Sequence, residues 1–284
     1  MTGTLLSLGH GYSAQALARR LSGEGWRIIG TTRHAARMAS LAVEGVEPVL
    51  WPGTPLAPLI AQASHILTSI APDDAGDPLL AAEGAALAAA PAVWVGYLST
   101  TGVYGDHGGA WVDEDTPLAP TTRRGIARVQ AERAWQALPL PLHIFRLAGI
   151  YGPGRGPFEK VLDGTARRIV KPGQVFSRIH VDDIAQALHA AMKAPTAGGI
   201  WNICDDDPAP PEDVIGYAAR LMGLPEPPTE LWDTAEMTPM ARSFYAESKR
   251  VRNDRMKRDL GIRLIHPDFR SGLAALLEEE AWVD

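Results

Sequence analysis

The segment Thr4-Leu5-Leu6-Ser7-Leu8-Gly9-His10-Gly11-Tyr12-Ser13-Ala14 decides the fold of this chain. It is typical of a short apolar strand, a glycine turn and the start of an amphipathic helix. In nucleotide-binding α/β proteins the first glycine allows a tight turn, and the second lets the backbone approach a pyrophosphate at the helix N-terminus. We therefore predict that a dinucleotide contacts Gly9, His10, Gly11, Tyr12, Ser13 and Ala14; the alternative is a purely structural turn.

Apolar runs alternate with helical patterns through the first half of the chain. The predicted strands are Thr4–Leu8, Arg27–Thr31, Glu47–Trp51, His65–Ser69, Val93–Leu98 and Leu142–Leu147. The predicted helical stretches between them include Arg33–Leu41, Pro78–Ala89 and Thr121–Leu138. This alternation, with nearly continuous apolar strands, predicts a parallel sheet covered by helices on both faces.

The pattern changes after Tyr151. Lys171-Pro172-Gly173-Gln174, between two apolar pairs, predicts a hairpin. A helix at Val181–Met192 and a last strand at Ile200–Ile203 return to the sheet, and a final helix is expected at Phe269–Trp282. The predicted fold is a Rossmann doubly wound parallel sheet with a small C-terminal α+β substrate lobe. We assign residues 1–152 and 179–204 to the dinucleotide-binding domain, and residues 153–178 and 205–284 to the lobe.

Composition narrows the class of protein. The 284 residues are 46% hydrophobic and carry a net charge of −6, which gives no basic surface for nucleic acid or an anionic membrane. Cys204 is the one cysteine, so no internal disulfide is possible. No signal segment is evident at the start, and the most apolar stretch is too short to span a bilayer. We expect a cytoplasmic protein that acts on a small molecule without nucleic acid or membrane partners, as a homodimer if it assembles.

Five segments, taken in order, carry a resemblance to a known family. They are Gly9–Ala14, Leu98–Gly105, Arg146–Arg155, Arg178–Ala185 and Trp201–Ile203. Together they resemble the extended short-chain dehydrogenases/reductases of the NAD-dependent epimerase/dehydratase type, over nearly the whole chain. The resemblance implies a Rossmann sheet with a substrate lobe, and a Ser or Thr that cooperates with a Tyr-x-x-x-Lys pair on the following helix.

The chain departs from that family at the catalytic pair. Thr100 falls on the Ser/Thr position, but Arg124 stands where the tyrosine is expected and Arg128 where the lysine is expected. Arginine does not exchange a proton near neutral pH, so the usual proton relay is missing. We assign Thr100, Arg124 and Arg128 to the catalytic site, with the arginines as an anion clamp and Arg128 also on the cofactor. The alternative is a solvated basic face in which Arg128 pairs with Glu132.

One Tyr-x-x-x-Lys does occur, from Tyr245 to Lys249. Because it lies beyond the last strand of the sheet, we interpret it as surface packing without a chemical role. His107, in a glycine-rich loop, is a further candidate for a substitute acid.

The remaining candidates concern cofactor and substrate. Thr32 and Arg33 end the second strand, where NAD-preferring proteins carry an acidic residue, so we predict NADP in preference to NAD. Ser69, Ile70 and Ala71 follow the fourth strand, where the resemblance implies that the backbone passes beside the cofactor. Thr101, Arg178 and His180 are assigned to the substrate. His180 with Asp182 and Asp183 could be metal ligands, but adjacent residues at a helix start favour a cap, and we predict no metal.

The sequence thus favours an atypical NADP(H)-binding member of this superfamily, a slow reductase or epimerase for a small polar substrate that is sugar-like or carries a carbonyl. The alternative is a dinucleotide-binding sensor or scaffold without turnover that acts through a protein partner. The missing Tyr and Lys favour the sensor, whereas Thr100 and the substrate lobe favour the enzyme.

Overall fold

A seven-stranded parallel sheet forms the centre of the computed structural model, which describes residues 3–193 and 198–279. Its strands are β1 (Thr4–Leu8), β2 (Arg27–Thr32), β3 (Glu47–Leu50), β4 (His65–Thr68), β5 (Trp94–Thr100), β7 (Leu142–Leu147) and β11 (Gly199–Ile203). They lie in the order β11-β7-β5-β4-β1-β2-β3. β1 and β4 are paired neighbours, and the chain leaves their carboxyl ends toward opposite faces of the sheet, to the helices Tyr12–Leu21 and Pro78–Ala88. Folds of this kind bind ligands at such a point.

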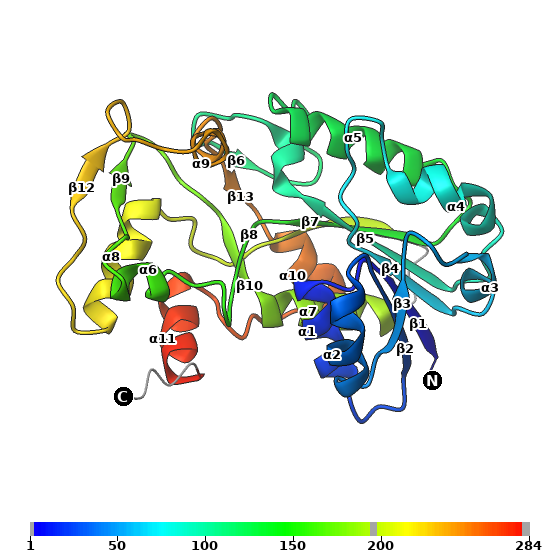
Figure 1. The fold of residues 1–284 in the computed structure, drawn as a ribbon. Coiled ribbons are helices and arrows are strands. Elements are labelled where there is room, and N and C mark those ends of the chain that lie inside the picture. The colour runs from blue at the N-terminus through cyan, green and yellow to red at the C-terminus, as the bar shows by residue number, and fades with distance from the viewer. Residues whose placement is uncertain (1–2, 194–197, 280–284) are drawn as a thin grey trace.

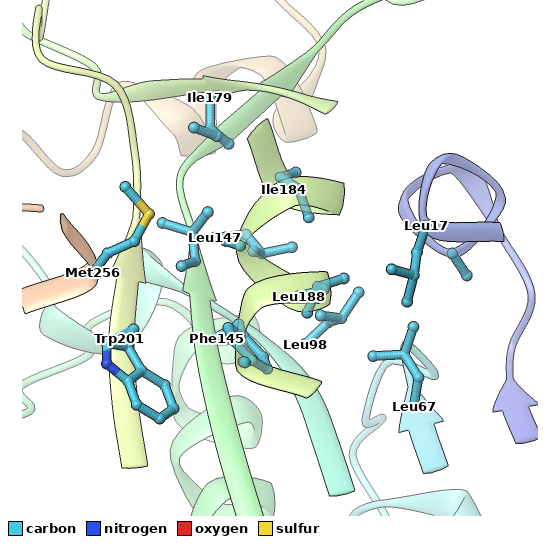
Figure 2. Close-up of a cluster of buried hydrophobic side chains, with 14 of the residues drawn as sticks. Leu17, Leu67, Leu98, Phe145, Leu147, Ile179, Ile184, Leu188, Trp201 and Met256 are labelled. Carbon is cyan, nitrogen blue, oxygen red and sulfur yellow. The ribbon is translucent and has the colours of Figure 1, made fainter. Parts of the chain in front are cut away.

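Helices cover both faces of the sheet, as predicted (Figure 1). One face carries α1 (Tyr12–Leu21), α2 (Met38–Val43), α7 (Val181–Lys193) and α10 (Asp254–Leu260). The other carries α3 (Ala57–Ile60), α4 (Pro78–Ala88) and α5 (Arg123–Gln136). Neighbouring strand residues alternate between these layers: Leu5 packs into the first core and Leu6 into the second. Figure 2 shows Ile184 and Leu188 of α7 beside Leu98 and Phe145 of the sheet.

A smaller lobe lies beside the sheet (Figure 1). It contains α6 (Phe158–Leu162), β9 (Arg168–Val170), α8 (Pro211–Leu221), β12 (Thr229–Leu231), α9 (Pro239–Phe244) and α11 (Phe269–Glu279). Its helices α6, α8 and α11 share a separate apolar core around Phe158 and Phe269. The C-terminal part of the last predicted helix, residues 280–282, lies outside the described residues.

The predicted hairpin around Lys171 is wrong. The turn exists, because Gln174 N donates to Lys171 O at 3.0 Å. The segments on either side nevertheless separate: β9 pairs in parallel with β12, and Phe176 bridges to Ala209. Turn residues fix the local bend, but the partner of each strand is decided by the packing of the lobe.

Two short parallel pairs lie outside the central sheet and join distant parts of the chain. β8 (Gly149–Tyr151) pairs with β10 (Arg178–His180), and β13 (Arg250–Val251) pairs with β6 (Trp111–Val112). The pair of β9 with β12 lies within the lobe. Val251, Met256 and Leu260 join the core of the sheet domain, although the sequence assigned residues 205–284 to the lobe. The division of the chain into two domains stays a prediction. The segment from Val251 to Leu260, which was assigned to the lobe, packs in the core of the sheet domain.

Residues 3–193 and 198–279 contain no helix that is both long and apolar enough to cross a membrane.

Candidate functional site

The glycine turn has the geometry that a dinucleotide site requires. Gly9 has φ +78°, and a Cβ there would lie 2.8 Å from Ile70 Cγ1. Gly11 is the N-cap of α1 and offers no side chain to the free amides of the first turn. A Cβ at Gly11 would meet only Gly9 O, at 3.7 Å, so the space above the turn is open. The helix N-terminus therefore faces an open region that suits an anion.

The side chains of the other residues of the turn contact the protein itself. His10 is buried, its Nδ1 lies 2.9 Å from Ser7 Oγ, and burial lowers its pKa to about 4. Its ring packs against Gly30, so only the backbone of His10 is available to a cofactor. Tyr12 donates from its hydroxyl to Pro153 O at 3.0 Å. Ser13 and Ala14 are buried on the helix side.

The end of β2 presents cations. Thr32 is buried, and its hydroxyl accepts a hydrogen bond from His34 N at 3.2 Å. Arg33, between these two residues, is exposed. Arg37 lies one turn further on and is close enough to contribute to the lowered pKa of His10, after burial. Arg37 belongs to no sequence motif of a dinucleotide site, and only the turn of the chain after β2 brings it back toward His10.

The segment after β4 mainly supports the glycine turn. Ser69 donates from its hydroxyl to Gly9 O, and Ile70 packs against Gly9. Ala71 is the residue of this segment that lines the neighbouring cavity.

That cavity, of about 830 Å³, lies between the carboxyl edge of the sheet and the lobe. Its wall includes Ala148–Tyr151 after β7 and the 3₁₀ turn η2 (Thr101–Tyr104) after β5. Thr100 also lines it and accepts from Gly102 N at 3.1 Å. Helix α5 approaches η2 closely at Gly125, where a Cβ would lie 2.8 Å from Gly102 O. This close approach places the arginines of α5 beside Thr100.

Arg124 and Arg128 both face the cavity, as their four-residue spacing predicts. Arg124 is exposed; its Nη2 lies 3.3 Å from Ser243 Oγ, and its guanidinium lies 5.3 Å from the Phe244 ring. Arg128 donates from Nη1 to Tyr97 Oη and Leu98 O, each at 2.9 Å.

Glu132 has other partners than Arg128, so the alternative pairing is wrong. It forms a buried ion pair with Arg146, with 2.8 Å between Oε2 and Nη2. This pair lies behind the cavity and fixes α5 against β7.

Arg178 is also in the cavity wall. Its Nη1 donates to Phe176 O and Ala209 O at 2.9 Å each, which holds the guanidinium at the lobe side. Behind it lies Asp205, whose pKa burial raises to about 8 although Arg178 opposes the shift.

His180 does not line the cavity. It is buried against His266, with 4.0 Å between ring centroids, and burial followed by the charge of His266 lowers its pKa to about 4. His180, Asp182 and His266 could offer ligand atoms within 4.8 Å of one another, but Nδ1 of His180 already accepts from Asp182 N at 3.2 Å. Asp183 instead holds the backbone of Ile265 and His266.

Tyr245 and Lys249 line the same cavity, which corrects their interpretation as surface packing. The Tyr245 ring lies 5.3 Å from the ring of Trp232 and 5.6 Å from that of Phe176. Lys249 donates from Nζ to Gly105 O and to Glu247, at 2.7 Å each. His107 is absent from the described lining; its Nε2 lies 3.2 Å from Tyr104 O.

Comparisons with known sequences find one matching family model and several relatives. A sequence model of the NAD dependent epimerase/dehydratase family matches residues 84–204. Protein YeeZ of Escherichia coli (strain K12) is 38% identical over 136 residues, which are 46% of this chain and 47% of YeeZ. A 3-diazoavenalumate denitrifying reductase from a Streptomyces species is 30% identical over 220 residues, which are 70% of this chain and 65% of that protein. The match thus spans about half the length of YeeZ and just under two thirds of the reductase.

Solved structures share the fold over nearly the whole chain. A conserved protein of unknown function from Silicibacter pomeroyi DSS is 61% identical, with a TM-score of 0.95 over 98% of this chain and 99% of that one. UDP-glucuronic acid 4-epimerase from Bacillus cereus, solved in complex with NAD, has a TM-score of 0.78 over 99% of this chain and 100% of that one. Its sequence identity is 15%, so this likeness concerns the fold alone.

Proposed function

Because a sequence model of the NAD dependent epimerase/dehydratase family matches residues 84–204, we propose that this chain is a member of that family and an NADP(H)-dependent reductase or epimerase for a small, negatively charged substrate. The observation that carries the proposal is the cavity of about 830 Å³ that continues from the end of β5 to the lobe and is lined by Thr100, Arg124 and Arg128.

The residues at the sheet edge fit a dinucleotide. The open space above Gly11 and the uncapped N-terminus of α1 accommodate the pyrophosphate. The guanidinium of Arg155 lies 4.4 Å from the centre of the Tyr12 ring, between this helix end and the cavity. Arg155 is therefore a second cation for the same phosphates, next to the helix dipole.

The choice of NADP follows from the end of β2. Arg33 is exposed there, Arg37 lies nearby, and Thr32 has no acidic neighbour directly after the strand. A ribose 2′-phosphate carries negative charge that two guanidinium groups bind well, whereas a ribose hydroxyl is usually held by a carboxylate.

The substrate class follows from charge. Among the described residues, the cavity lining contains five cations and one carboxylate. The cations are Arg124, Arg128, Arg155, Arg178 and Lys249; the carboxylate is that of Glu247, which pairs with Lys249. Four arginines in one cavity of a chain with net charge −6 favour a carboxylate or phosphate on the substrate. Because Arg155 lies beside the end of α1 and binds the cofactor in this proposal, Arg124 from α5 and Arg178 from β10 remain for the substrate.

When bound, the nicotinamide supplies or accepts a hydride. Thr100 and Arg124 would donate hydrogen bonds to a substrate oxygen and stabilise the negative charge that develops on it. Arg128 would hold the cofactor ribose while it keeps α5 fixed to Leu98 O. None of these side chains relays a proton, which predicts slow turnover unless another group does so.

Two measurements test the proposal. Calorimetric titration of the purified chain should show NADPH binding, and oxidation of NADPH should follow addition of small α-keto or sugar acids. Absence of dinucleotide binding would refute the proposal. Tight NADPH binding with no turnover of carboxylated carbonyl compounds or sugar acids would favour the sensor, for which the loss of Tyr and Lys from α5 is the supporting observation.

A further inference from the structure

Tyr245 lines the cavity, although its motif lies beyond the last strand of the sheet. It follows α9 directly, as the C-cap of that helix, and its ring is packed between Trp232 and Phe176. Lys171 donates from Nζ to its backbone oxygen. The ring is therefore held from the lobe side, while the residue contributes to the wall of the cavity that Thr100 and the arginines of α5 also line.

The other titratable groups of the described lining are already engaged. Tyr151 donates its hydroxyl to Asp268 O at 3.4 Å and packs into the lobe core. Glu247 and Lys249 form an ion pair at 2.7 Å with both side chains about nine tenths buried. The arginines keep their protons near neutral pH. Within residues 3–193 and 198–279, burial and the charges of Glu212 and Arg178 act on the Tyr245 hydroxyl and no hydrogen-bond partner does, so this hydroxyl is available to a ligand in the cavity.

Arg178 lies on the same side of the cavity as Tyr245: its guanidinium is 5.9 Å from the centre of the Phe176 ring, which packs 5.6 Å from the Tyr245 ring, and both Arg178 and Tyr245 line the cavity. Burial raises the pKa of Tyr245, the charge of Glu212 adds to this, and the charge of Arg178 opposes it. Arg178 is held in place by Phe176 O and Ala209 O, beside the aromatic group that packs on Tyr245. Lys249 points instead to Gly105 O and Glu247. The Tyr-x-x-x-Lys spacing is thus not a helical pair here, and an arginine takes the place of the lysine.

We propose that Tyr245 is the proton donor of this site and that Arg178 stabilises its tyrosinate form, so that the lobe supplies the group missing from α5. The inference rests on the proposed function. In the reduction, a bound reduced nicotinamide would supply a hydride to the carbonyl carbon, and the C=O π electron pair would move to oxygen. That oxygen takes the proton from Tyr245 Oη, and solvent then reprotonates the tyrosinate. In the reverse direction the tyrosinate accepts the proton from the hydroxyl.

Tyr245→Phe is the direct test, because it keeps the ring between Trp232 and Phe176 and removes only the hydroxyl. Loss of a general acid should lower kcat about 100-fold or more, while KM and the Kd for NADPH stay within about twofold. Tyr217→Phe is the matched control: this lobe tyrosine packs on Phe269 outside the cavity and should leave kcat unchanged. Equal kcat for Tyr245→Phe and the wild type would overturn the proposal.

A second readout does not depend on turnover. In protein labelled with ¹³C at tyrosine Cζ, the resonance lost in Tyr245→Phe is that of Tyr245. We expect it to shift when NADP⁺ binds, and its pKa to rise in Arg178→Gln but not in Arg178→Lys. NADP⁺ binding by calorimetry with no shift of this resonance would refute the role of Tyr245 alone. Failure of NADP⁺ to bind would refute the proposed function, and this inference with it.

Discussion

Arg146 and Glu132 form an ion pair inside the protein, with 2.8 Å between Nη2 and Oε2 and both side chains at most 3% exposed. Ser99 donates to the same carboxylate at 2.5 Å, and Arg146 also donates to the Tyr104 hydroxyl at 3.0 Å. The carboxylate thereby joins α5 to β5 and β7. Glu132 lies one helical turn after Arg128, so this pair sets the orientation in which α5 presents its arginines to the cavity.

Glu132→Ala should destabilise the protein by about 3–5 kcal/mol, because it leaves a buried guanidinium without its counter-charge. The double variant Glu132→Leu with Arg146→Met should regain a large part of that loss, since two apolar groups need no partner. Urea unfolding of the three proteins measures this. Equal stability of Glu132→Ala and the wild type would contradict a buried, paired carboxylate.

Gly9 and Gly11 should respond differently to substitution. Gly11→Val leaves the fold intact, since a Cβ there meets nothing nearer than 3.7 Å, but it fills the space predicted for the pyrophosphate and should abolish dinucleotide binding. Gly9→Ala, in contrast, should lower the stability of the fold, because Gly9 has φ +78° and a Cβ there would lie 2.8 Å from Ile70 Cγ1. Thermal unfolding with and without NADPH separates the two effects. Unchanged affinity in a folded Gly11→Val would show that the turn is only structural.

Arg33→Ala should reduce NADPH affinity by about tenfold and leave NADH affinity nearly unchanged, because only NADPH carries the 2′-phosphate. Arg133→Ala, an exposed arginine in the last turn of α5, is the matched control. Shifts in Tm at equal ligand concentrations report both affinities. A larger shift with NADH than with NADPH in the wild type would contradict the prediction.

Substitution of Arg124 and of Arg128 should affect different steps, substrate turnover and cofactor binding respectively. Arg128→Ala removes hydrogen bonds to Tyr97 Oη and Leu98 O and should weaken NADPH binding about 10- to 100-fold. Arg124→Ala affects an exposed group held by Ser243 and Phe244 and should lower kcat/KM for the substrate instead. Calorimetry with NADPH and steady-state kinetics distinguish the two variants. Identical losses of affinity would argue against the assigned roles.

Asp205 should make stability depend on pH. Burial raises its pKa to about 8 from 3.8, so the folded protein keeps a proton that the unfolded chain has released between these values. The free energy of unfolding contributed by this group therefore falls as pH rises through that window. Asp205→Asn should remove this slope, which urea unfolding at about pH 5 and about pH 9 can measure. The same slope in both proteins would place the titrating group elsewhere.

The fold was predictable from the sequence because its strands are continuously apolar and its helices amphipathic. The strand pairs between segments far apart in the sequence could not be predicted. The turn at Lys171 was recognised, but nothing local indicates that Arg168–Val170 pairs with Thr229–Leu231. Similarly, Met256 reaches the sheet core only because the chain returns from the lobe.

The site divides in the same way. Thr100, Arg124 and Arg128 were found by their order along β5 and α5, and the structure brings all three to one cavity. Tyr245 could not be predicted, because its neighbours in sequence form no strand–helix unit and its packing on Phe176 and Trp232 depends on the tertiary structure of the lobe. His180 was assigned to the substrate from its place in a motif, yet it is buried away from the cavity.

The return of β13 and α10 to the sheet has a consequence for biosynthesis. Val251, Met256 and Leu260 complete the apolar layer that also contains Leu17 and Leu188. Ribosomes make these residues after most of the lobe, so the nascent sheet domain keeps an uncovered apolar edge until residue 260 has emerged. Neither part can be obtained by simple truncation, because removing the C-terminal region also removes a side of the Rossmann core.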